Sequence, residues 1–336
     1  MVSAAERKGT VGAVVVLVAL ALVPVVAHFA AQPFYITLIS RMLVFALAAV
    51  GLNLALGFGG LVSFGHALYL GIGAYAVGIL SFHGVTNGWV HLAVALGAGA
   101  AFAGLIGAVV VRVSGMTFIM ITLAFAQMGY FLAVSLKQYG GDDGLTINAR
   151  SALGLIDLSS NTQLYYGILA SLVLVLIAAK RLTGARFGLA LLGIKQNERR
   201  LLALGYPTFR YKLTAYVISA LICTLAGFWL ANLTKFAAPS YMAWTVSGEL
   251  IVMAVLGGMG TVFGPVVGAL ALLSFEEFLS SWQPGIPVLD NLLSNHWLGL
   301  IGLAIFALAL FARHGLFGYF VGQGKIAQSS PPSGGH

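Results

Sequence analysis

The sequence carries very little charge for its length. Only 8% of its 336 residues are Asp, Glu, Lys or Arg, whereas 60% are hydrophobic. Soluble domains carry charge at about a quarter of their positions, because charged side chains keep a protein surface in water. This deficit excludes an ordinary soluble protein. The 43 glycines point the same way, because glycine lets helices pack closely in lipid.

Residues and motifs that carry chemistry are also scarce. The one cysteine, Cys223, excludes a disulfide or a multi-cysteine metal site within the chain. The sequence contains no GxxxxGK[ST] phosphate-binding loop, no HExxH zinc motif and no GxSxG nucleophile elbow. The formal net charge of +8 comes from bases scattered between apolar runs, which form no nucleic-acid-binding motif. We therefore expect no catalytic residue, no metal site, no ATP hydrolysis by this chain and no nucleic-acid partner.

Apolar runs long enough to span a bilayer recur along the chain. About 20 apolar residues cross roughly 30 Å of hydrocarbon as a helix. The sequence therefore predicts an all-α, polytopic integral membrane protein with about ten hydrophobic segments, at 11–31, 36–56, 61–82, 89–111, 116–136, 164–180, 213–233, 248–262, 264–280 and 298–312.

The ends of the chain are expected to lie outside the membrane domain at 11–312. Residues 1–10 form a short basic segment before the first span. That span has the charge order of a signal peptide, but its apolar region is long and its cleavage site poor, so we expect it to stay attached. Residues 313–336 end in a stretch rich in Ser, Pro and Gly, which predicts a disordered tail.

The distribution of positive charge predicts the orientation. The segment 180–212 holds eight Lys and Arg residues against one acid, Glu198. Each buried charge costs about 2.5 to 3.5 kcal/mol, so eight would cost more than about 20 kcal/mol, and the segment cannot be a span. We expect it to form a cytoplasmic loop at 181–212. An even number of spans on either side then places both termini in the cytoplasm and the acidic loop at 137–161 outside.

Two glycine-rich stretches interrupt the apolar runs, at 51–73 and 256–269. Both pair a Gly-Gly with a hydroxyl and a further glycine, which favours a two-half internal repeat with short or broken helices at about 248–280. Simple helix packing explains the glycines equally well. The glycines in question are Gly59, Gly60, Gly65, Gly257, Gly258 and Gly264.

The basic segment also contains a short amphipathic helix at 193–206. Apolar residues alternate with charged ones, and Gly205 follows as a C-terminal cap. Such an element suits docking to another protein. The alternative is a basic helix that lies on anionic lipid.

Four ordered stretches carry a resemblance to a known family. They read GLNLALGFGGLVSFGHALYLGIGAYA, TLAFAQ followed by GGDDGL, FGLALLGIKQNERRLLALGYPTFRYKL, and VLGGMGTVFGPVVGA. Together they resemble the permease subunits of branched-chain amino acid ABC importers, over about 41–278. The resemblance extends to permeases of the same superfamily for urea and short amides.

The resemblance implies a set of partners. They are a second permease chain, two cytoplasmic ATPase chains that bind ATP and Mg, and a periplasmic or surface amino-acid-binding protein, all around a bacterial cytoplasmic membrane. It also implies a coupling loop that docks on the ATPase, where Glu198, Ala203 and Gly205 match the family pattern. Arg199 and Arg200 depart from it, because alanine and an acidic residue are usual there.

Polar side chains within the apolar runs are candidates for a translocation path. Unpaired polar groups are costly in hydrocarbon, so these side chains should face a cavity or another helix. Glu249 either sits at the interface, stabilised by a helix dipole, or holds a substrate amine. The alternative of an ion-coupled carrier needs an ionisable relay, for which only Glu249, Glu276 and Glu277 qualify. The path candidates are Asn53, Ser63, His66, Gln127 and Glu249.

Overall fold

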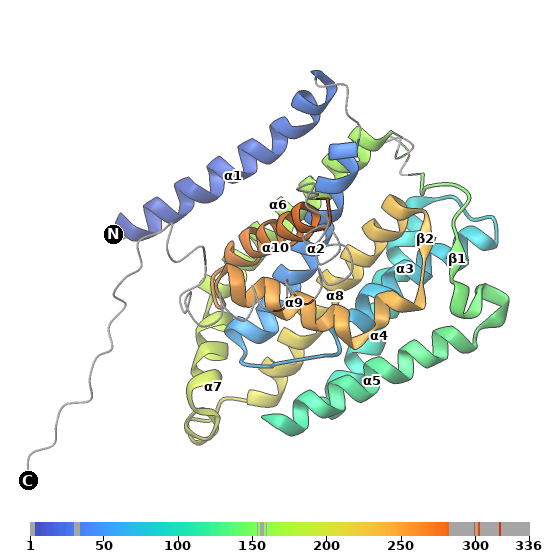
Figure 1. Cartoon of the computed structure of the whole chain (residues 1–336). Helices are drawn as coiled ribbons and strands as arrows, with labels where there is room; N and C mark the ends of the chain where they lie inside the picture. Colours follow the sequence, from blue (N-terminus) through green and yellow to red (C-terminus); the bar gives the residue numbers. More distant parts are fainter. Residues whose placement is uncertain are drawn as a thin grey trace, which may run out of the picture.

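The computed structural model describes residues 4–29, 34–152, 154, 158, 160–281, 299, 302 and 316. Within these residues the chain forms ten α-helices in one bundle (Figure 1). They are α1 (Ala4–Phe29), α2 (Phe34–Asn53), α3 (His66–Phe82), α4 (Gly88–Val110), α5 (Met116–Ser135), α6 (Asn161–Gly184), α7 (Arg186–Ala203), α8 (Thr208–Thr234), α9 (Trp244–Gly257) and α10 (Gly264–Ser281).

The shorter elements lie between the helices. A π-helix, Leu54–Phe58, continues α2, and 3-10 turns cover Lys137–Tyr139, Gly141–Asp143 and Pro239–Met242. Strands β1 (Leu145–Thr146) and β2 (Phe236–Ala237) pair antiparallel, with Leu145 opposite Ala237. This pairing ties the loop between α5 and α6 to the chain that leads from α8 into α9.

The predicted all-α membrane fold is confirmed. Five helical segments are long and apolar enough to cross a bilayer: Phe34–Phe58, Gly88–Val110, Met116–Ser135, Asn161–Gly184 and Thr208–Thr234. Shorter apolar helices cover Val11–Ala27, His66–Phe82 and Trp244–Gly257. The expected tenth span, 298–312, lies outside the described residues except at positions 299 and 302, as does the predicted tail except at 316.

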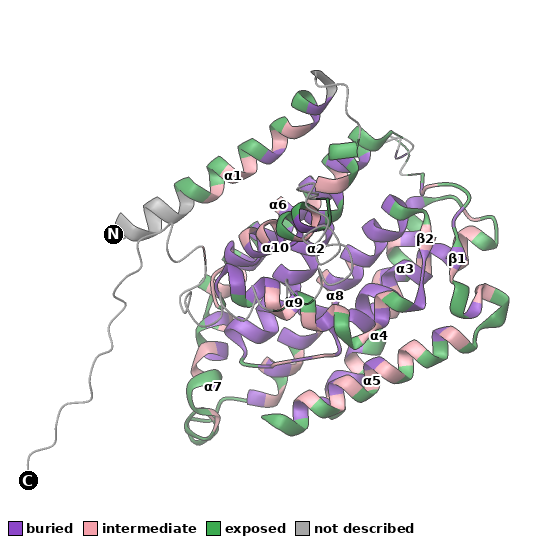
Figure 2. Cartoon of the chain, viewed as in Figure 1, coloured by how far each residue is buried: buried purple, intermediate pink, exposed green. Residues whose placement is uncertain are grey.

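Helix α8 forms the centre of the bundle and packs against α2, α3 and α4. Its contacts depend on small residues. A Cβ at Gly73 of α3 would overlap the carbonyl of Thr224, and a Cβ at Gly227 would overlap that of Leu70. The backbones of α3 and α8 therefore touch, as small residues allow in lipid. Figure 2 shows buried residues concentrated on these central helices, while α1 and α5 carry many exposed ones.

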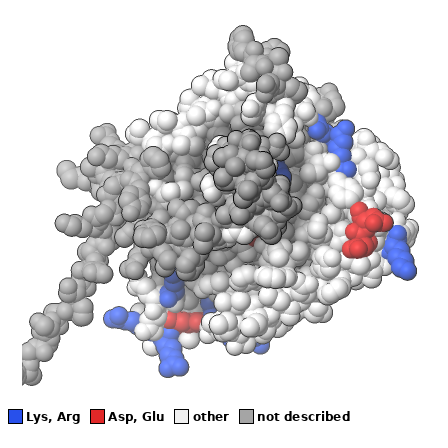
Figure 3. Space-filling view, viewed as in Figure 1, with Lys and Arg blue, Asp and Glu red and all other residues white. Residues whose placement is uncertain are grey.

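Charged side chains of the described residues gather mainly at two ends of the visible face, and much of the described surface between them is uncharged (Figure 3). One end carries α7, and the other carries β1 and β2 (Figure 1). This separation suits a protein whose middle lies in hydrocarbon, where charges are costly. Exposed Met120, Met128 and Phe131 of α5 belong to the apolar middle.

The peripheral helix α1 is held at its proline. Pro24 has no N–H, so the carbonyl of Leu20 four residues earlier receives no helical hydrogen bond. The Tyr165 hydroxyl of α6 donates to that carbonyl at 2.5 Å, and the Tyr166 hydroxyl donates to the next one, Ala21, at 3.2 Å. Because an unpaired carbonyl is costly in lipid, this contact fixes α1 against α6.

We predict that Tyr165→Phe destabilises the protein by about 1–3 kcal/mol, because it leaves the buried Leu20 carbonyl without a donor. Thermal unfolding in detergent micelles measures the effect. Tyr166→Phe is the matched control, because the Ala21 carbonyl that Tyr166 binds also has the helical N–H of Val25 four residues later as a partner. Equal effects of the two variants would contradict this role of Tyr165.

One predicted boundary was wrong. The span expected at 61–82 begins only at His66, because 59–65 is not helical. Within the predicted loop at 181–212, helix extends from Arg186 and is kinked at Asn197, so it covers more than the expected 193–206. Helix α1 begins at Ala4 and its apolar part covers Val11–Ala27. The predicted division into 1–10, 11–312 and 313–336 stays a prediction.

Candidate translocation and coupling site

The helix that starts with α2 ends in an unusual way. After Asn53 its hydrogen bonds shift to the π pattern over Leu54–Phe58, and the chain then runs without helix through 59–65. A π-helix is rare, and single π turns occur frequently at functional sites. Gly59, Gly60 and Gly65 all lie in this non-helical segment. The segment separates α2 from α3 within the bundle.

Side-chain hydroxyl groups accept hydrogen bonds from backbone N–H groups at and just before the start of α3. The first N–H groups of a helix have no partner within it. Here the Thr122 hydroxyl of α5 accepts from the Phe64 N–H at 3.2 Å, and the Ser247 hydroxyl of α9 accepts from the Ala67 N–H at 2.9 Å. The buried Ser63 hydroxyl accepts from the Gly65 N–H at 3.2 Å. Ser63 therefore already has a local structural partner.

Asn53 joins the π-helix to the turn between α9 and α10. Its amide nitrogen donates to the Thr261 carbonyl at 2.8 Å, and its amide oxygen accepts from the Gly260 N–H at 3.2 Å. The two segments approach so closely that a Cβ at Gly57 would lie 2.6 Å from the Gly260 nitrogen. Asn53 thus holds together two helix breaks that lie about 200 residues apart in sequence.

Helices α9 and α10 form a tight hairpin. A Cβ at Gly257 would overlap the Gly264 carbonyl, so the crossing requires glycine. Gly257 ends α9, Gly258 lies in the turn and Gly264 begins α10. The Thr261 hydroxyl accepts from the Gly264 N–H at 3.0 Å and donates to the Gly258 carbonyl at 2.8 Å. The segment expected to be broken at 248–280 therefore consists of two helices joined by this turn.

His66 is fully buried at the start of α3. Its Nε2 lies 2.7 Å from the Ser219 hydroxyl, which donates to the Gly51 carbonyl at 2.6 Å. Because that hydroxyl proton is used, the Nε2–H donates to Ser219. The rings of Tyr69 and Tyr216 meet the imidazole edge to face, at 5.9 and 5.4 Å between centroids. His66 therefore joins α3, α8 and α2 in the interior of the bundle.

The remaining two path candidates lie elsewhere. Gln127 is half-buried on α5, the peripheral helix. Glu249 is exposed on α9, within electrostatic reach of Arg41 and Glu276. The five path candidates are therefore not gathered in one place, and their role in translocation stays a prediction.

Helix α7 lies beside the π-helix at the charged end of the bundle. Its backbone leaves the helical conformation at Asn197, whose side chain accepts from the Arg200 N–H at 3.0 Å and so starts a second short helical piece. That piece ends at Gly205, with φ of +84°, a conformation that only glycine adopts readily. The Tyr206 N–H bonds to the Leu201 carbonyl and the Gly205 N–H to the Leu202 carbonyl, the pattern of a Schellman cap.

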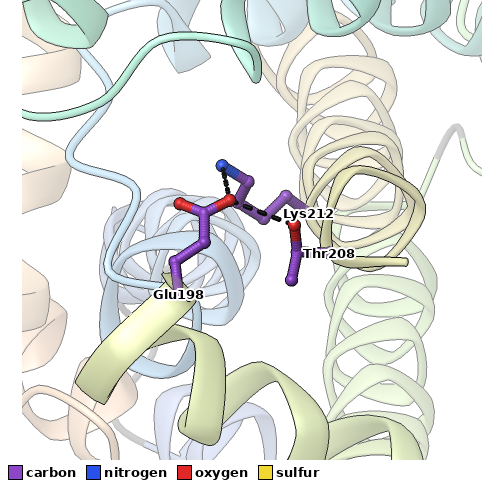
Figure 4. Close-up of polar contacts among 3 residues, drawn as sticks. All are labelled: Glu198, Thr208 and Lys212. Atoms are coloured by element: carbon purple, nitrogen blue, oxygen red, sulfur yellow. Dashed lines mark hydrogen bonds and ion pairs between the residues drawn. The ribbon is translucent and has the colours of Figure 1, made fainter. Parts of the chain in front are cut away.

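Two side chains fasten α7 to the bundle. The Glu198 carboxylate points toward α8 (Figure 4), where it pairs with the buried Lys212 ammonium at 2.7 Å and accepts from the Thr208 hydroxyl at 3.2 Å. Lys195 donates to the Gly57 carbonyl of the π-helix at 2.7 Å. Both lysines line a cavity of about 300 Å³ between α7, the 59–65 segment and the start of α5. Helix α7 is thereby connected to α2 and to α8.

The second piece of α7 presents an uncovered surface. Arg199 and Arg200 are exposed, and so are Leu202, Ala203 and Leu204. Leucines that stay exposed beside a charged rim are typical of a surface that another protein covers. Glu198 instead faces inward.

A family model described as "Branched-chain amino acid transport system / permease component" matches residues 34–310. The chain belongs to this family. It is 26% identical over 291 residues to the high-affinity branched-chain amino acid transport system permease protein LivM of Salmonella typhimurium strain LT2, a match that covers 80% of this chain and 68% of the relative. It is 27% identical over 292 residues to the protein of the same name from Escherichia coli strain K12, with the same coverage. No solved structure matches the chain.

Three residues that attach α7 to the rest of the permease were not predicted from the sequence. Lys195, Thr208 and Lys212 fasten α7, yet in the sequence they are only members of a basic, polar stretch. The position of Lys212, four residues after the start of α8 and at the beginning of an apolar run, could have predicted that it is paired. A charge there requires a partner, and Glu198 is the one acid of the segment.

We predict that Asn53→Leu destabilises the permease by about 2–4 kcal/mol, because the Gly260 N–H and the Thr261 carbonyl both lose their partner. Unfolding in detergent micelles measures the loss. Asn148→Leu makes the same exchange at an exposed position and should change stability by less than about 0.5 kcal/mol. A similar small effect at Asn53 would show that the two helix breaks do not depend on it.

Proposed function

We propose that this chain is the permease subunit of an ATP-driven importer that moves branched-chain amino acids into the cytoplasm. The observation that carries the proposal is helix α7, which is fastened to α2 and α8 on one side and leaves leucines and arginines uncovered on the other. An ATP-driven transporter whose own sequence lacks a phosphate-binding loop needs such an element to receive force from a separate ATPase.

The contacts define a route for that force. Movement of α7 reaches the π-helix through Lys195 and the Gly57 carbonyl, and reaches α8 through Glu198 and Lys212. From the π-helix, Asn53 passes it to the turn between α9 and α10. Because packed helices shift between discrete arrangements, this route suits alternating access.

The remaining parts of the proposed machine are partner chains. They are a second permease subunit, two cytoplasmic ATPase subunits that hold ATP and Mg, and a periplasmic or surface binding protein that selects the amino acid. The proposed location is the bacterial cytoplasmic membrane, with both termini and α7 in the cytoplasm. The excess of Lys and Arg in 180–212 supports this orientation.

The proposal is tested by reconstituting the permease with its ATPase and binding protein in vesicles and measuring uptake of labelled leucine. We expect uptake to require ATP and to be competed by isoleucine and valine. Competition by urea or acetamide instead would assign an amide cargo. Uptake driven by a sodium or proton gradient without ATP would identify an ion-coupled carrier and overturn the proposal.

The orientation has its own test. Because the single cysteine, Cys223, is fully buried, Arg200→Cys supplies one accessible thiol. We expect an impermeant maleimide to label this variant in inside-out vesicles and not in right-side-out ones. The reverse result would place α7 outside and remove the ATPase from the proposal.

The coupling role predicts the effect of changes at α7. Gly205→Ala forces a non-glycine residue into the left-handed conformation at a cost of about 1–2 kcal/mol and should lower uptake several-fold. The matched control is Gly84→Ala, because Gly84 has a φ of +77° and free space for a Cβ, but lies at the opposite end of the bundle. Equal loss in both variants would mean that strain alone lowers uptake.

Reversal of the ion pair tests the fastening itself. Glu198→Lys should place two ammonium groups side by side and abolish uptake, whereas the double variant Glu198→Lys with Lys212→Glu should restore at least part of it. Uptake that is unchanged in the single variant would exclude a coupling role for Glu198.

A further inference from the structure

Three charged side chains lie in one layer near the end of the bundle opposite α7. They are Arg41 on α2, Glu249 on α9 and Glu276 on α10. With a rise of about 1.5 Å per residue, Arg41 lies about 10 Å inside the start of α2, and each glutamate lies about 8 Å inside its helix end. Helices α2, α9 and α10 pack pairwise against one another. The three charges thus lie between one and two turns from an end of three helices that pack together.

The charges act on one another without closing into ion pairs. Arg41 attracts both carboxylates, and Glu249 repels Glu276. Among the described residues the one ion pair within 4.0 Å is that of Lys212 with Glu198, so Arg41 forms no direct pair with either glutamate. Arg41 lies over the ring of Phe45 instead, at 5.8 Å from its centroid. Ionisable side chains within membrane helices are rare and commonly mark substrate or ion pathways.

A cavity opens at this layer between α2 and α10. Its volume is about 180 Å³, and its lining is divided between polar and apolar side chains. Its polar part comes from one base, two acids and a hydroxyl, namely Arg41, Glu276, Glu277 and Ser280, and its apolar part from Leu38, Met42 and Leu273. Such a cavity offers a guanidinium, two carboxylates and a hydrocarbon wall within the same small space.

We propose that this cavity is a binding site for a free amino acid with an apolar side chain. The Arg41 guanidinium takes the carboxylate of the ligand, since its planar fork matches a carboxylate. Glu276, with Glu249 beside it, takes the ammonium group, and the apolar wall takes the side chain. The proposal deepens the proposed function, on which its choice of ligand rests.

A single-cysteine protection experiment tests the site without ATP or a binding protein. Ser280→Cys places a reactive thiol in the cavity lining, because Ser280 is exposed and Cys223 is buried. We expect about 10 mM L-leucine to slow its reaction with a small methanethiosulfonate at least about threefold, as occupancy of a site with a Kd of a few millimolar would. Leu38→Cys repeats the measurement from α2. Ser135→Cys, on the exposed end of α5, is the matched control and should show no protection.

Ligand analogues and charge variants define the chemistry. 4-Methylpentanoate lacks the ammonium group and 3-methylbutylamine lacks the carboxylate. Each should therefore need at least about a tenfold higher concentration than leucine to slow the thiol reaction equally. Arg41→Gln and Glu276→Gln should each abolish protection by leucine, and Arg41→Lys should retain part of it. Equal protection by all three compounds, protection that survives Arg41→Gln, or absence of protection at both thiols would each overturn the site.

Two further measurements test whether the cavity binds a cation or a lipid headgroup instead of an amino acid. Sodium chloride that protects as well as leucine would assign a cation site. Protection without leucine in phosphatidylethanolamine vesicles, but not in phosphatidylglycerol vesicles, would assign a lipid headgroup. Both results overturn the proposal. Failure of ATP-driven uptake with leucine protection intact would reject the proposed importer and leave the amino acid site standing.

Discussion

Backbone N–H and C=O groups inside the hydrocarbon layer have no water to bind, so every break in a helix must be closed by protein groups. This permease interrupts its helices at 59–65 and at the turn between α9 and α10, and side chains meet the demand each time. Asn53 serves the turn, since its amide binds one carbonyl and one N–H there. Thr122 and Ser247 serve the start of α3. These intramembrane polar residues therefore have a structural task.

The same constraint accounts for features far from the two breaks. Pro24 removes one N–H from α1, and the Tyr165 hydroxyl supplies the missing donor to Leu20. The π-helix ends with the Gly57 carbonyl bound by the Lys195 ammonium, so a charged side chain of α7 completes a span of the membrane domain. A helix that is closed by a group on α7 cannot move independently of it. The backbone requirement thus produces the mechanical connection on which transport is proposed to depend.

Sequence alone predicted the class of fold and most of the spans, because runs of about 20 apolar residues have few alternatives to a membrane helix. It also predicted the cap at Gly205, which depends on a local backbone conformation. It could not predict that Asn53 binds Thr261 or that Lys195 reaches Gly57, because those pairs are set by packing across about 140 to 210 positions. The late start of α3 was missed for a related reason. Residues 59–65 are apolar enough to continue a span, and the hydroxyls that stabilise their non-helical path come from α5 and α9.

Helix α2 connects the two regions to which a transport role is assigned. Arg41 stands near one end of it, and Asn53 and the Gly57 carbonyl stand at the other. Arg41 and Asn53 are twelve residues apart, or about 18 Å along a helix. Both ends of this stretch also touch the α9–α10 hairpin, through Glu276 at the cavity and through Gly260 and Thr261 at the turn. If α9 and α10 move as one body with the turn, a displacement of the turn relative to α2 changes the spacing of the charges at the cavity, because α9 and α10 carry two of them. The proposed transfer of force at α7 and the proposed amino acid site at Arg41 in this way share one three-helix unit.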